Sequence, residues 1–183
     1  MGNSIILDPY DVYRMTTGMG KSMQELLAAS VELNVVDGVI LPNLKMQGAE
    51  EACAYLDEEG RCSIHPYRPG ICRLFPLGRY YENGGFSYFL QTGECAKENR
   101  SKIKVSKWID TPDLTRNQQF TLQWHDLLHA MEERLTGEDE GKQREENLLL
   151  LRLFYLLPYE GTIDFYTQFT ERMEHWNGQN GQI

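Results

Sequence analysis

Apolar and polar residues follow a helical period over most of the second half of this chain. Apolar side chains recur every three or four residues over residues 120–135 and again over residues 164–176. Residues 148–157 are apolar on almost every side of a helical wheel, and Pro158 follows them. These patterns predict two amphipathic helices and one helix that is buried between others.

Two shorter helices are predicted near the N-terminus from their start signals. Asp8 stands before a proline, which is typical of an N-cap and first helical residue, and this helix should stop near Gly18 and Gly20. Ser22 and Glu25 have the spacing of a capping box. Apolar positions as far as Val31 predict that the second helix continues to that residue.

Short apolar runs separated by turn residues replace the helical period between residues 35 and 95. The pattern predicts one short strand over residues 35–41 and a β-hairpin around the glycine-containing turn at residues 82–85. We therefore expect an α+β fold, in which a small cysteine-rich β-hairpin core is flanked by N-terminal helices and a C-terminal helical bundle. Residues 1–110 would form a metal-binding domain, and residues 111–183 a helical extension packed on it.

All four cysteines of the chain fall within 43 residues, in the pattern C-x8-C-x9-C-x22-C. The turn at residues 57–60 predicts a compact hairpin, with Cys53 just before one strand and Cys62 within the other. A single helical turn would carry Cys72, and Cys95 follows the second hairpin. Cysteines placed only for packing would be scattered through the chain, so the clustering indicates a binding site.

Composition and charge narrow the classes of partner. The chain has 183 residues, a formal net charge of −9 and a pI near 5.0, with 41% hydrophobic and 25% charged residues. A negative field disfavours nonspecific binding to nucleic acid or to an anionic membrane. We find neither a run of about 20 apolar residues nor a signal-peptide pattern, which favours a reducing, cytoplasmic location. Thiols in such a compartment are more often ligands than disulfides.

The cysteine pattern predicts a metal site made by Cys53, Cys62, Cys72 and Cys95. Four thiolates around zinc or around an oxidised [4Fe–4S] cluster carry net negative charge, which Arg68 and Arg73 could balance, helped by Arg61. The spacing lacks the C-x2-C knuckles of zinc ribbons, so it favours an iron–sulfur cluster, although zinc stays open. Buried apolar cysteines, disulfides and substitution of His65 for one thiol are the alternatives.

The middle of the chain resembles a known family. It resembles the cysteine-cluster proteins of the YkgJ type, which carry the CxxCxxCC domain. The chain meets the pattern of that family at Cys53, Leu56, Gly60, Cys62, Ile64, His65, Arg68, Pro69, Cys72, Arg73, Phe75, Pro76 and Cys95. The segment over residues 6–15 also looks like the family. The resemblance implies a bacterial protein that chelates zinc or iron. The family's namesake cysteines normally precede residue 6, and no cysteine stands there. Either this variant dispenses with them or the chain begins late.

Three functions are compatible with these features. The first is a metal-binding protein in which the metal has a structural or redox role. The second is an enzyme related to the flagellin lysine methylases, whose cysteine cluster is similar, although no methyl-donor site is recognisable here. The third is a protein-interaction module that the metal stabilises.

Overall fold

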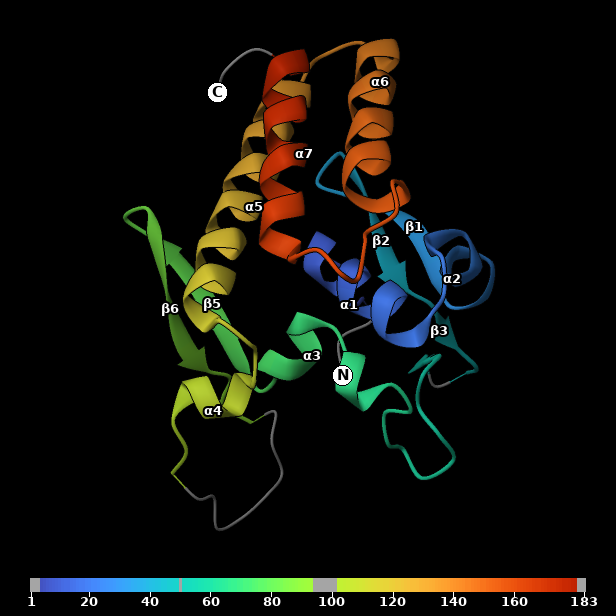
Figure 1. The fold of residues 1–183 in the computed structure, drawn as a ribbon, viewed down its shortest axis with the longest axis vertical. Helices are drawn as coiled ribbons and strands as arrows, with labels where there is room; N and C mark the ends of the chain where they lie inside the picture. The colour runs from blue at the N-terminus through green and yellow to red at the C-terminus, as the bar shows by residue number, and fades with distance from the viewer. Residues whose placement is uncertain (1–3, 50, 94–101, 181–183) are drawn as a thin grey trace.

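The computed structural model describes residues 4–49, 51–93 and 102–180, and these form an α+β fold, as the sequence predicts (Figure 1). The described helices are α1 (Pro9–Met19), α2 (Met23–Ala29), α3 (Gly70–Leu74), α4 (Val105–Ile109), α5 (Leu114–Leu135), α6 (Glu140–Leu151) and α7 (Phe165–Asn180). The described strands are β1 (Val31–Val36), β2 (Val39–Leu44), β3 (Met46–Gln47), β4 (Ala52–Cys53), β5 (Leu77–Glu82) and β6 (Gly85–Leu90), which pair as three antiparallel two-stranded sheets.

The capping signals place the two N-terminal helices as predicted. The Asp8 side chain accepts a hydrogen bond from the Asp11 backbone N–H, and Gly20 ends α1 in the left-handed conformation with φ of 64°. Ser22 and Glu25 form the predicted capping box of α2. The expected extension to Val31 is wrong, because α2 ends at Ala29 and Val31 pairs with Leu44 in a sheet.

The single strand predicted over residues 35–41 is also wrong, since these residues belong to the hairpin of β1 and β2. Asp37 and Gly38 have positive φ values of 51° and 82°, the conformation that a two-residue hairpin turn requires. Pro42 lies inside β2, opposite Leu33, and its carbonyl accepts a hydrogen bond from the Leu7 N–H at 2.9 Å. The segment before α1 thus lies along β2. The hairpin predicted around the turn at residues 82–85 is confirmed, since β5 and β6 pair there.

Helices α5, α6 and α7 stand side by side as a bundle, with the β5–β6 hairpin beside α5 (Figure 1). The predicted helix over residues 148–157 is only partly confirmed. The α-helix ends at Leu151 and continues as a π-helical turn over Arg152–Leu156. Leu148 and Leu157 are 54% and 49% exposed, so this segment is not buried on every side.

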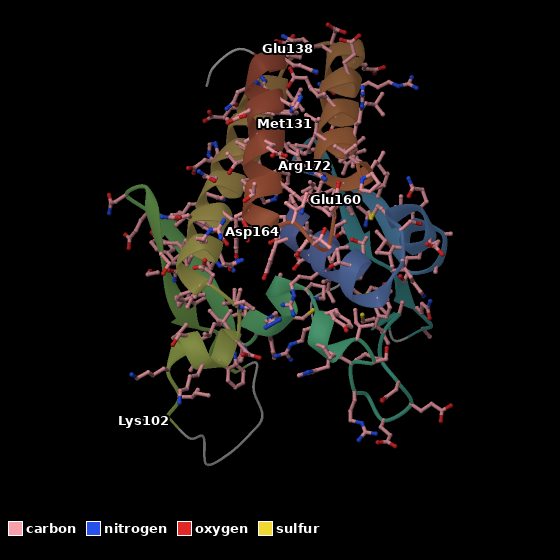
Figure 2. All side chains as sticks on the ribbon, in the orientation of Figure 1. Lys102, Met131, Glu138, Glu160, Asp164 and Arg172 are labelled. Atoms are coloured by element: carbon pink, nitrogen blue, oxygen red, sulfur yellow. The ribbon has the colours of Figure 1, made fainter. Side chains whose placement is uncertain are left out.

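Arg172 of α7 stabilises the end of that turn. Its guanidinium donates hydrogen bonds to the carbonyls of Leu153, Leu157 and Pro158 at 2.7–3.0 Å, and it stacks 3.6 Å from the centre of the Tyr159 ring. Figure 2 places Arg172 between the helices of the bundle. Carbonyl groups at a helix end that have no intrahelical partner are satisfied in this way by a cation.

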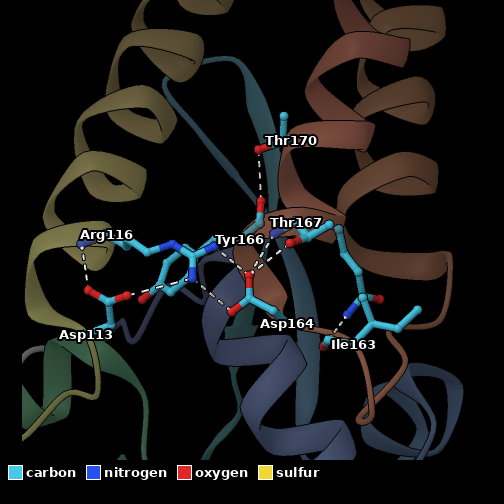
Figure 3. A network of polar contacts seen from close by, with 8 residues as sticks. Asp113, Arg116, Ile163, Asp164, Tyr166, Thr167 and Thr170 are labelled. Atoms are coloured by element: carbon cyan, nitrogen blue, oxygen red, sulfur yellow. Dashed lines mark hydrogen bonds and ion pairs between the residues drawn. The ribbon is translucent and has the colours of Figure 1, made fainter.

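A polar network joins α5 to the start of α7 (Figure 3). Arg116 donates to both carboxylate oxygens of Asp164, at 3.3 and 2.6 Å, and lies over the Tyr166 ring. Asp164 also accepts a hydrogen bond from the Thr167 N–H at 3.0 Å, the usual bond of an N-cap. The bidentate geometry fixes the two helices in relative position.

One hydrophobic core runs through both halves of the chain. Buried residues from Leu7 to Trp176 form a single cluster, and the buried Tyr155 hydroxyl donates to the Leu7 carbonyl at 3.0 Å. The division into residues 1–110 and 111–183 stays a prediction. None of the helices in the described ranges is long and apolar enough to cross a membrane.

Candidate metal site

Short backbone pairings position the first two cysteines. Cys53 lies in β4 and pairs with Met46, while Cys62 forms an isolated antiparallel bridge with Leu56. The predicted turn is present, because Asp57 accepts the Gly60 N–H through its carbonyl at 2.9 Å. The hairpin expected around it consists of that one bridge, and Cys53 belongs to a different sheet. The two thiols nevertheless flank the same tight loop.

The third cysteine is held by a short helix that is anchored to α1. A 3₁₀ turn over His65–Tyr67 leads into α3, which carries Cys72 as predicted. The Gly70 N–H at the start of α3 donates to the Asp11 side chain at 2.6 Å. Because Asp11 is buried inside α1, this hydrogen bond fixes the position of Cys72 relative to the N-terminal helix.

The three described cysteines influence one another electrostatically. Burial, together with the nearby Asp11, Cys53 and Cys62, raises the pKa of Cys72 to about 12. Burial also raises the pKa of Cys53, with a contribution from Cys62. These effects disfavour a thiolate at Cys53 and Cys72 when no cation is bound. A bound metal ion would reverse this effect.

Asp11 lies close enough to Cys72 to raise its pKa, and Asp8 caps α1 beside Asp11; the sequence pattern predicted only the capping role of Asp8. Burial raises the pKa of Asp8 to about 6, and burial together with the Asp8 charge raises the pKa of Asp11 well above its ordinary value. Arg79 opposes the shift at Asp8. The signal was the presence of aspartate at both ends of a capping box, where the second position usually carries glutamate or glutamine.

The arginines expected around the metal occupy different positions. Arg68 is half-buried and lowers the pKa of Cys72, so its charge reaches the thiols. Arg73 is 6% exposed, and its Nε donates to the Ile109 carbonyl at 3.1 Å. Arg61 is exposed and pairs with Asp57 and Glu59 in the turn.

The described residues contain no group of three or more His, Cys, Asp or Glu side chains arranged to hold a metal. Cys95, the fourth predicted ligand, lies outside those residues. The half-buried thiols are still suitable in kind for zinc or an iron–sulfur cluster, because thiolates bind both. The side chain of His65 is exposed.

The described residues form an α+β fold in which three cysteines come from separate segments. Residues 5–91 match the model of the CxxCxxCC family, described as a "Putative zinc- or iron-chelating domain". The resemblance noted in the sequence is thus confirmed. No curated protein and no solved structure matches the chain.

Proposed function

We propose that this protein binds an iron–sulfur cluster or a zinc ion through Cys53, Cys62, Cys72 and Cys95. The observation that carries the proposal is the effect of Cys53 and Cys62 on Cys72, whose ionisation both disfavour, and of Cys62 on Cys53. Such a group is stabilised by a cation that accepts thiolate ligands. The family's description as zinc- or iron-chelating supports the same chemistry.

The residues around the thiols would serve the site in distinct ways. Arg68 would offset the negative charge of a thiolate-bound metal. Asp11 would keep Cys72 in place through its hydrogen bond to the Gly70 N–H. The cysteine spacing without C-x2-C knuckles favours an iron–sulfur cluster, and the role of the metal would be structural or redox.

Serine substitution tests the ligand set. Iron, sulfide and zinc should be measured in anaerobically purified wild-type protein and in the variants Cys53→Ser, Cys62→Ser and Cys72→Ser. We expect each variant to lose most of the metal while its far-UV circular dichroism stays close to that of the wild type.

The variant His65→Gln is the matched control, because His65 lies in the same segment and could otherwise replace a thiol. It should keep its metal. Full metal content in all three serine variants, or loss of metal only in His65→Gln, would show that the proposed ligand set is wrong.

A further inference from the structure

A hollow of about 430 Å³ lies between the segment that carries Cys72, the helix α4 and the side of α1. Its polar lining includes Arg14, His65, Arg68, Arg73, Asp110 and Thr111. The size is within the range of roughly 300–1,000 Å³ that is typical of small-molecule sites. Arg68 is also proposed to offset the charge of the metal site, but neither the family's description nor the thiol ligands account for the rest of the hollow.

The hollow concentrates positive charge on a chain whose net charge is −9. Three guanidinium groups face one carboxylate, so the lining carries a net charge of +2 with His65 neutral. Asp110 offsets little of this charge, since its side chain is 90% exposed and its Oδ2 is 3.9 Å from the Nη2 of Arg73. A ligand that carries two negative charges would neutralise the charge of the lining.

Two of the arginines have capacity for a ligand. The Nη1 atom of Arg14 is buried and makes no hydrogen bond in the described part of the chain, although Nη2 of the same group donates to the Pro66 carbonyl. Arg68 makes neither a hydrogen bond nor an ion pair with any described residue. An anion in the hollow would therefore meet the Arg68 guanidinium with no competing partner among the described residues, and would lie beside the positive charge of Arg14.

We propose that this hollow binds the phosphate group of a small phosphorylated molecule. The guanidinium groups of Arg14, Arg68 and the buried Arg73 supply planar, paired N–H donors, which match phosphate oxygens. A phosphate monoester is close to a dianion at neutral pH and balances the lining. The volume exceeds that of a phosphate group alone, so the remainder of the molecule occupies the rest of the hollow.

Calorimetric titration of the protein as purified tests this site, with orthophosphate and phenyl phosphate as probes at constant ionic strength. We expect both probes to bind. Arg68→Gln and Arg14→Gln should each weaken binding roughly tenfold or more, because each removes charged hydrogen bonds to the anion. The control Arg144→Gln removes the same charge from an exposed residue of α6 and should leave binding unchanged.

Two further comparisons separate phosphate binding in this hollow from general anion binding and from phosphate held by the metal. Acetate should bind more weakly than orthophosphate, since a monoanion leaves the lining unbalanced. If the metal held the phosphate, binding would be lost in Cys53→Ser and kept in Arg14→Gln, and this result would overturn the proposal. The proposal would also be overturned if no phosphate bound, or if Arg14→Gln, Arg68→Gln and Arg144→Gln all changed binding equally. The proposal does not depend on a metal, so failure of the metal site would leave it standing.

Discussion

Replacing Asp8 by asparagine should stabilise this protein at neutral pH. The carboxylate caps α1 beside the buried Asp11, and the charge of an ionised Asp8 raises the pKa of Asp11. Burial, partly offset by hydrogen bonds and by Arg79, raises the pKa of Asp8 from 3.8 to about 6. Asparagine caps a helix as well as aspartate does, but carries no charge.

The size of the effect follows from the pKa shift. One pKa unit corresponds to about 1.4 kcal/mol, so a shift of about two units corresponds to about 3 kcal/mol once Asp8 is ionised. Asp8 keeps part of its surface exposed, and solvent screening reduces this value. We therefore expect Asp8→Asn to raise the free energy of unfolding by about 1–2 kcal/mol at pH 7.5.

The pH dependence has a definite sign. A raised pKa means that the folded state binds the proton more tightly than the unfolded state. The resulting contribution of Asp8 to the free energy of unfolding is full below pH 3.8 and is lost as the pH rises through about 6. The free energy of unfolding of Asp8→Asn should therefore exceed that of the wild type only slightly at pH 4, and by the full amount at pH 7.5.

Urea unfolding followed by far-UV circular dichroism at pH 4, 5.5 and 7.5 measures this difference. Asp126→Asn is the control, because Asp126 is an exposed residue of α5, and we expect a change within about 0.5 kcal/mol at each pH. The reasoning is refuted if Asp8→Asn is less stable than the wild type at pH 7.5, or if the difference between them does not vary with pH.

Three further outcomes are expected. Adding zinc to metal-free protein at pH 7.5 should release protons into a weakly buffered indicator, because burial and neighbouring negative groups keep Cys72 protonated, with a pKa of about 12; unchanged indicator absorbance would contradict this. Phe154→Ala should lower the free energy of unfolding by about 3–5 kcal/mol in urea titrations, since the ring is fully buried and packs against Trp124 and Phe169; a loss under about 1 kcal/mol would contradict the described core. Tyr155→Phe should cost about 1 kcal/mol in the same assay by removing the hydrogen bond to the Leu7 carbonyl, and an unchanged midpoint would contradict that bond.

Local signals in the sequence predicted those features that depend on a few neighbouring residues. The capping box of Ser22 and Glu25 acts over one helical turn, so its residues alone place the start of α2. The turn at Asp37 and Gly38 is equally local, but the apolar residues on either side read as one continuous strand, and the hairpin was missed. Periodicity likewise could not reveal the π-helical turn after Leu151, where Arg172 of another helix binds the carbonyls.

The site depends more strongly on distant contacts. The cysteine spacing predicted a cluster, yet the hydrogen bond between Asp11 and Gly70 joins positions 59 residues apart. The guanidinium of Arg73, which follows Cys72 in the sequence, is buried and donates to the Ile109 carbonyl, 36 residues away. No pattern of residue types near Arg73 carries that information, because only the fold brings α3 and α4 together.

X-ray absorption at the metal edge of anaerobically purified protein tests the central claim most directly. The account predicts bound iron or zinc whose nearest neighbours are sulfur atoms at about 2.3 Å, the length of a metal–thiolate bond. A nearest-neighbour shell of nitrogen or oxygen alone, at about 2.0–2.2 Å, would contradict thiolate coordination by Cys53, Cys62 and Cys72.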